Sequence, residues 1–138
     1  MTYPEALQHL HSLRQFGFQP GLETTRCLAA AAGNPHERLQ FIHVAGTNGK
    51  GSVCAMLESV YRASGRRVGL YTSPHLVRFG ERLQINRTPI SDALLARHVA
   101  ELRDLAARLP GLEPTFFEFT TVLALRYFAE QGVDLAGW

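Results

Sequence analysis

The chain has 138 residues, of which 46% are hydrophobic and 19% charged, and its formal net charge is +2. This length suits one domain that buries a core without disulfides or a structural metal. The 14 Lys and Arg residues are scattered, which argues against a nucleic-acid surface, and no apolar run approaches the ~20 residues of a membrane span. The first residues lack the pattern of a signal peptide, and the cysteines fit no metal or redox motif. We therefore expect a cytoplasmic protein without nucleic-acid or membrane partners.

The first half of the chain predicts two helices, a buried strand and a third helix. Apolar residues at helical spacing indicate a helix over 4–14, and an Ala-rich stretch indicates another over 22–32. Residues 41–45 form a short apolar run followed by glycine, which is typical of a buried strand. Beyond residue 50 the apolar residues return to the spacing of one helix face, at Val53, Met56, Leu57, Val60 and Tyr61.

The second half continues with a strand over 67–71, so that strand, helix and strand form a βαβ unit with parallel strands. A small hairpin is expected over 81–90, around the pair Asn86-Arg87. Helices follow over 91–108, with Ser91 as the N-cap, and over 115–131. The first of these helices is expected to turn four residues inward, namely Leu95, Val99, Leu102 and Leu109.

The last residues predict the opening of a third strand, from about Val133. A sheet that stops there would be cut short and would leave an unpaired edge. Because unpaired edges pair readily with other chains, we expect self-association through this edge.

A glycine-rich segment of the kind that binds phosphate lies between the first strand and its helix. Its backbone amides can approach phosphate oxygens, its lysine can reach the terminal phosphates, and a following hydroxyl can hold magnesium. The strict pattern would have glycine at position 44 and a hydroxyl at position 51, where this chain has Val44 and Gly51. A glycine-rich turn with an ordinary surface lysine is the alternative, but the strand before and the helix after favour a phosphate loop. The loop comprises Gly46, Thr47, Asn48, Gly49, Lys50, Gly51 and Ser52.

Three segments together resemble one family. The segment from His43 to Ser52 resembles the phosphate loop of the Mur ligase superfamily, and its Lys-Gly-Ser ending is the form of the folylpolyglutamate synthase and dihydrofolate synthase family. Residues 71–82 resemble that family's loop after the second strand, and residues 115–120 resemble the start of its Phe-Glu helix. The resemblance implies an α/β fold, a P-loop parallel sheet with flanking helices as in the Mur-ligase ATPase domain. Residues 1–138 would be the N-terminal part of that ATP-binding domain, without the C-terminal glutamate-binding domain.

The resemblance also implies an activity. It is that of an ATP-dependent carboxylate–amine ligase, with ATP and Mg²⁺ as cofactors, that adds L-glutamate to a folate or dihydropteroate carboxylate through an acyl phosphate. Lys50 would neutralise charge on the transferring phosphoryl group. Because the glutamate-binding domain would be missing, we expect no amide formation by this chain alone. The alternatives are a non-catalytic P-loop fragment and a nucleotide-binding module of another class.

The resemblance to this family implies that three residues are magnesium ligands, namely Ser52, Ser73 and Glu118. For Ser73 the alternative is a turn initiator, since Ser-Pro is a common start of a turn. For Glu118 the alternative is a capping box with Thr115, which precedes it by three residues. A carboxylate among phenylalanines needs a partner because an isolated buried charge is costly, and the resemblance favours the metal.

Five further residues are candidate contacts for the acidic substrate. His75, Arg78 and Arg82 follow the second strand, where they could bind the substrate or be solvated loop residues. His11 and Ser12 lie where the family has a Leu-His-Ser stretch near its pterin pocket. An exposed helical position without a substrate role is the alternative for these two.

Overall fold

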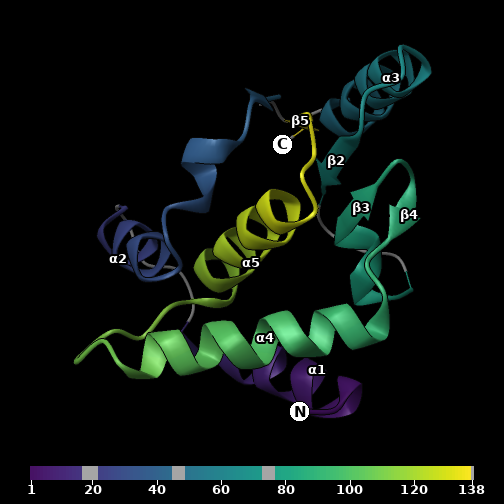
Figure 1. Ribbon diagram of the computed structural model, residues 1–138. Coiled ribbons are helices and arrows are strands. Elements are labelled where there is room, and N and C mark those ends of the chain that lie inside the picture. The colour runs from purple at the N-terminus through teal and green to yellow at the C-terminus, as the bar shows by residue number, and fades with distance from the viewer. Residues whose placement is uncertain (17–21, 45–48, 73–76, 138) are drawn as a thin grey trace. The chain divides into compact units, whose positions relative to one another are not determined.

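The computed structural model describes residues 1–16, 22–44, 49–72 and 77–137 (Figure 1). The chain forms two compact units, one of residues 1–37 with 92–127 and the other of residues 38–91 with 128–138. In chain order the elements are α1 (Tyr3–Ser12), η1 (Leu13–Phe16), α2 (Glu23–Ala31), η2 (Pro35–Arg38), β1 (Phe41–Ile42), α3 (Lys50–Ala63), β2 (Val68–Tyr71), η3 (Phe79–Arg82), β3 (Leu83–Ile85), β4 (Thr88–Pro89), α4 (Asp92–Ala107), α5 (Phe116–Glu130) and β5 (Leu135–Gly137), where η denotes a 3-10 helix.

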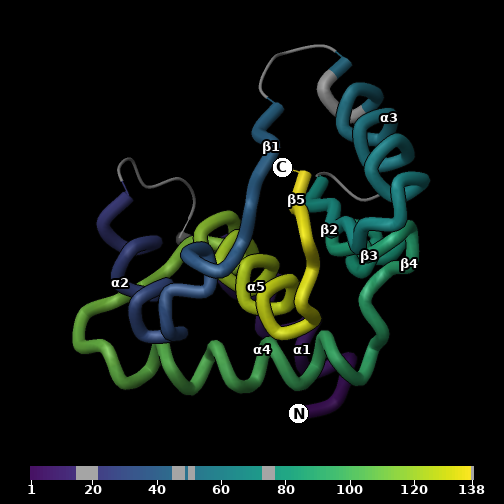
Figure 2. The backbone as a smooth tube through the Cα atoms, turned by 45° about the horizontal axis from the view of Figure 1, so that its top comes forward, coloured from purple at the N-terminus to yellow at the C-terminus, as the bar shows by residue number. Residues whose placement is uncertain are grey.

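The second unit contains a five-stranded sheet in the order β1-β5-β2-β3-β4. β1, β5 and β2 are parallel, which confirms the parallel strands of the predicted βαβ unit, and β3 and β4 are antiparallel. β5 lies between β1 and β2 (Figure 2). The strand predicted near Val133 is therefore an interior strand, and in the described part of the chain the sheet edges are β1 and β4. The expectation that this strand leaves an unpaired edge is therefore wrong, because β5 has a strand partner on both sides. Self-association of the chain stays a prediction.

The predicted hairpin is confirmed as β3 and β4. Ile85 pairs with Thr88, so only Asn86 and Arg87 form the turn. Both have positive φ angles, 48° and 66°. Two such residues make the tight turn whose twist matches that of antiparallel strands, and asparagine tolerates this conformation well.

The first unit is helical, and α1 packs against α4. Thr2 begins α1 by accepting the Glu5 amide on its hydroxyl at 3.3 Å. On α4, Leu95, Val99 and Leu102 are buried as predicted. Leu109, predicted to lie inward with them, is beyond the end of the helix and only half-buried. No helix within the described ranges is long and apolar enough to cross a membrane.

Helix α3 is present as predicted, but its apolar stripe is not its buried face. Val53, Met56 and Val60 are 40%, 61% and 65% exposed. Among the α3 side chains that the structure describes, the buried ones are Cys54 and Glu58, one helical turn apart. The spacing of apolar residues predicted the helix correctly, whereas the orientation of the helix depends on its contacts with β2 and β5.

Gly69 allows a close contact in the middle of this sheet. A Cβ atom at Gly69 would lie 2.9 Å from Cδ1 of Phe128, whose ring is fully buried. Real Cβ atoms do not approach other atoms so closely, and a packed aromatic ring has little room to move. Glycine is therefore required at this position for packing.

We predict that Gly69→Ala lowers the free energy of unfolding by about 1–3 kcal/mol, the usual cost of overpacking a core. Equilibrium urea unfolding measures it. The double variant with Phe128→Leu should lose less stability than the two single losses together, because the smaller side chain makes room for the methyl group. Strictly additive losses would show that the Phe128 ring is not what excludes a side chain at Gly69.

Candidate phosphate-binding site

The start of α3 has the backbone geometry that a phosphate loop requires. β1 leads toward the loop, and α3 begins at Lys50 immediately after it. Gly49 is the N-cap of α3 with φ of 76°, a left-handed conformation that favours glycine. The predicted order of strand, glycine-rich segment and helix is thus confirmed. Gly46, Thr47 and Asn48 lie outside the described residues.

The first turn of α3 presents backbone amides that could bind an anion. Within the described part of the chain, no side chain caps this helix start, and its first turn carries no acidic residue. The amide of Val53 donates to the Gly49 carbonyl at 3.0 Å, so the amides before it in the turn have no intrahelical acceptor. Ser52 is exposed in this turn. Free amides, the helix dipole and a hydroxyl group together suit a phosphate with a magnesium ion.

The space between α3 and the sheet cannot hold a ligand. It has a volume of about 10 Å³ and is lined mainly by apolar side chains, among them Cys54, Leu57 and Val68. That volume admits about one water molecule. A nucleotide would therefore bind beyond the helix start and not beneath the helix.

The segment after β2 leads into a short ordered turn. Ser73 and His75 are not among the described residues. The Glu81 carboxylate accepts the amides of Val77 and Arg78, at 3.1 and 2.9 Å. This carboxylate fixes the start of η3, and the Arg78 side chain is exposed.

Arg82 ends η3 and is 7% exposed. Its guanidinium lies over the Phe79 ring, 5.5 Å from the ring centroid, and its carbonyl accepts the Thr72 amide at 3.1 Å. The interpretation of Arg82 as a solvated loop arginine is therefore wrong. The burial follows from 3-10 geometry, which turns residues three apart, Phe79 and Arg82, to one side. Contact with substrate stays a prediction for both Arg78 and Arg82.

Glu118 and Thr115 form a capping box at the start of α5. The Thr115 amide donates to Oε1 of Glu118 at 2.9 Å, and the Glu118 amide donates to Oγ1 of Thr115 at 3.2 Å. Both residues are buried. The capping alternative is thus confirmed as geometry, and it uses one carboxylate oxygen. A magnesium contact through the second oxygen, Oε2, stays a prediction.

His11 and Ser12 lie at the end of α1, and both are exposed. The Ser12 hydroxyl donates to the His9 carbonyl at 2.6 Å, so it satisfies a carbonyl of the last helical turn. This exposure agrees with the alternative interpretation, in which the two residues lie at an exposed helical position and have no substrate role. A substrate contact stays a prediction for both residues.

The candidate residues divide between the two units. The first unit contains His11, Ser12 and Glu118. The second contains the phosphate loop, Arg78 and Arg82. Sequence reasoning missed a polar cluster in this second unit, around the buried carboxylate of Glu58. The four-residue spacing of Glu58 and Arg62 signals a helical ion pair, but no sequence signal marks the third member, Arg87.

A hollow of about 220 Å³ lies in the first unit, between α1, the end of α4 and the start of α5. His9 lines it, half-buried, with its ring edge-on to Phe119 at 5.4 Å between centroids. Burial lowers the pKa of His9 below its ordinary value of 6.5, and the nearby positive charge of Arg103 lowers it further. The neutral imidazole is therefore the form that this environment favours.

We predict that His9 makes the protein less stable in mild acid. As the pH falls through 6.5, the unfolded chain takes up a proton that the folded protein binds only at lower pH, so the free energy of unfolding falls until the folded pKa is reached. Urea unfolding at pH 7.5 and 5.5 measures the loss. It should be smaller in His9→Gln than in the parent. The same loss in both proteins would contradict the prediction.

No family model matches the chain, but curated relatives do. It is 46% identical over 138 residues to a probable bifunctional folylpolyglutamate synthase/dihydropteroate synthase of Haloferax volcanii, covering 99% of this chain and 16% of the relative. It is 41% identical over 140 residues to folylpolyglutamate synthase of Lacticaseibacillus casei, covering 99% and 33%. The chain therefore spans a third or less of the length of these relatives.

Solved structures agree in fold. The folylpolyglutamate synthetase from Lactobacillus casei superimposes with a TM-score of 0.95 at 41% identity, over 100% of this chain and 36% of that one. A folylpolyglutamate synthase complex with AMPPCP and folate matches with a TM-score of 0.91 at 39% identity, over 100% and 35%.

The mixed α/β fold, with a parallel-containing sheet and flanking helices, is that of an N-terminal domain of the Mur-ligase type. Within that class, the chain belongs by homology to the folylpolyglutamate synthase and dihydrofolate synthase family. It corresponds to the N-terminal part of the family's members.

Proposed function

We propose that the chain is the nucleotide-binding part of an ATP-dependent ligase that attaches L-glutamate to a folate or dihydropteroate carboxylate. The observation that carries the proposal is the start of α3 behind left-handed Gly49, where no side chain of the described residues caps the helix. Homology to folylpolyglutamate synthases supports the ligase class, and the AMPPCP and folate complex of one of them supports the choice of ligands. Because the chain spans a third or less of its relatives, amide formation is proposed for a polypeptide with their further length. We propose that this polypeptide is located in the cytoplasm.

The proposed reaction has two steps. The substrate carboxylate attacks the γ-phosphorus of ATP, and the bond from that phosphorus to the β,γ-bridging oxygen breaks. ADP departs as the leaving group, and the substrate becomes an acyl phosphate. The amine of glutamate then attacks the acyl carbon, inorganic phosphate leaves, and the amine loses a proton as the amide forms. In the first step the amides of α3 and the charge of Lys50 would stabilise the phosphoryl oxygens.

The residues at the helix start fit a magnesium ion bound with the nucleotide. Ser52 offers an exposed hydroxyl in the first turn of α3, a hard oxygen ligand of the kind that Mg²⁺ accepts beside phosphate and water. Ser73 and the Oε2 atom of Glu118 are the further proposed ligands. The ion would supply positive charge to the transferring phosphoryl group. The five proposed substrate contacts remain His11, Ser12, His75, Arg78 and Arg82.

We predict that Lys50→Ala weakens MgATP binding roughly 10- to 150-fold, because a hydrogen bond to a charged group contributes about 1.5–3 kcal/mol. Isothermal titration measures the affinity, and circular dichroism checks the fold. Lys50 is the only lysine in the sequence, so an amine-reactive reagent followed by peptide mass spectrometry gives a second test. MgATP should slow labelling of Lys50 and leave the N-terminal amine as an unchanged internal reference. Equal affinity in both proteins, without protection of Lys50, would defeat the assignment.

We predict opposite effects from the two members of the α5 capping box. Glu118→Gln keeps a side chain that can accept the Thr115 amide, so stability should change by less than about 0.5 kcal/mol, but the magnesium dependence of ATP binding should weaken. Thr115→Ala should lower stability by about 1 kcal/mol, the usual cost of losing an N-cap, and leave that dependence unchanged. Nucleotide titrations over a magnesium series, with urea unfolding of each variant, separate the roles. If Glu118→Gln left the magnesium dependence intact, Glu118 would be a helix cap alone.

A further inference from the structure

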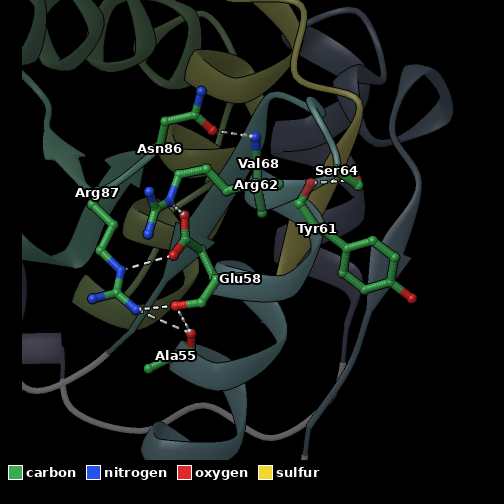
Figure 3. Close-up of polar contacts among 9 residues, drawn as sticks. Ala55, Glu58, Tyr61, Arg62, Ser64, Val68, Asn86 and Arg87 are labelled. Atoms are coloured by element: carbon green, nitrogen blue, oxygen red, sulfur yellow. Dashed lines mark hydrogen bonds and ion pairs between the residues drawn. The ribbon is translucent and has the colours of Figure 1, made fainter.

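A buried carboxylate on α3 is held by arginines from two different elements (Figure 3). The Glu58 side chain is only 1% exposed. Its Oε2 accepts from Nε of Arg62 at 2.9 Å, and its Oε1 accepts from Nε of Arg87 at 2.8 Å. Each carboxylate oxygen therefore has its own guanidinium partner, which offsets the cost of burying the charge.

The two arginines differ in what they connect. Arg62 lies on α3 itself, four residues after Glu58, so its contact stays within the helix. Arg87 comes from the turn of the β3–β4 hairpin, and its Nη2 also donates to the Ala55 carbonyl at 3.2 Å and to the Ser59 hydroxyl. Arg87 thus contacts three residues on one side of α3, spaced as i, i+3 and i+4. It is the member of the cluster that joins the hairpin to the helix.

The hairpin turn is itself fixed to the sheet. Oδ1 of Asn86 accepts the Val68 amide at 2.9 Å (Figure 3). The Asn86 amide also donates to the Val68 carbonyl at 2.8 Å. Arg87 follows Asn86 in a turn where both residues have positive φ, so its backbone direction is defined. Asn86 and Arg87 therefore link β2 to α3, so the position of the helix depends on the position of the strand.

This connection bears on the phosphate loop because α3 begins there. Glu58 lies eight residues after Lys50, roughly 12 Å along the helix axis at 1.5 Å per residue. An α-helix transmits a rotation about its axis along its whole length. The opposite side of α3, with Val53, Met56 and Val60, is exposed and gives no comparable restraint. The rotational setting of the first turn of α3 thus depends on the contacts that Arg87 makes, in addition to the packing of α3 on β2 and β5.

We propose that Arg87 is a positioning residue for nucleotide binding, which sets the orientation of α3 by joining it to the β3–β4 hairpin. The proposal rests on the proposed function, since it assumes that the start of α3 binds the phosphates of ATP. Arg87 itself does not touch the nucleotide in this account. Its effect is to hold the amides of the first helical turn in the direction that a phosphate needs.

The test compares Arg87→Met with Arg62→Met. Both variants remove one guanidinium from Glu58 and keep an apolar stem, and the two arginine side chains are similarly exposed, at 49% and 41%. MgATP affinity is measured by titration, and stability by urea unfolding. Arg87→Met should weaken affinity roughly three- to tenfold, since small displacements of binding groups are costly. Arg62→Met should stay within about twofold, and Arg87→Lys, which keeps the charge, should recover part of the loss.

Hydrogen exchange without nucleotide provides a second readout. In Arg87→Met, amides in the first turns of α3 should exchange faster than in Arg62→Met at equal global stability. Equal affinities and equal exchange in the two methionine variants would overturn the proposal, as would a loss of stability in Arg87→Met without a loss of affinity. A parent chain that neither binds MgATP nor shows protection of Lys50 would instead defeat the proposed function, and the exchange comparison would still decide whether Arg87 orients α3.

Discussion

The pairing of β5 with β1 on one side and β2 on the other is the interaction on which the proposed phosphate-binding region depends. Ala136 lies opposite Phe41 in one pair of strands and opposite Gly69 in the other. β1 has only two residues, and within the described part of the chain its strand partner is β5. Since short strands are stable only when paired in a larger sheet, β5 keeps the entry to the phosphate loop in place.

Further hydrogen bonds hold β5 and the residue before it in place. The Ala136 amide donates to the Gln40 carbonyl at 2.8 Å, just before β1. Asp134 receives the Arg67 amide on its carboxylate at 2.9 Å and returns its own amide to the Arg67 carbonyl at 2.8 Å. These bonds set the register of three strands at once. The sheet then offers a defined surface on which α3 rests through Cys54 and Glu58.

The features predicted best from the sequence are those that depend on residues close together in the chain. The turn at Asn86 and Arg87 was predicted from the local pattern, and both residues adopt the positive φ angles of such a turn. The spacing of Thr115 and Glu118 likewise predicted the capping box that forms. Both features depend on a few consecutive residues, so their signals are complete within the segment.

Contacts between distant segments could not be predicted in this way. Arg82 is buried although it follows a loop, and Arg87 reaches a carboxylate 29 residues before it. The buried face of α3 could not be predicted for the same reason, because Glu58 is buried while Val53, Met56 and Val60 of the apolar stripe are exposed. Magnesium binding by Glu118 would likewise depend on segments distant in the chain. It requires groups from elsewhere in the chain, which the local pattern around Glu118 does not contain.

The interior place of β5 also has a consequence for how the chain folds. The paired residues Phe41 and Ala136 are more than ninety residues apart, whereas the β3–β4 hairpin closes over two. The hairpin and the helices can form early, but β1 can pair only after β5 has been synthesised. At ~5–20 residues per second, the synthesis of the residues between Phe41 and Ala136 takes about 5–20 s. Because non-local pairing of this kind slows folding, we expect the joining of β1 to the sheet to be a late step in the folding of this unit.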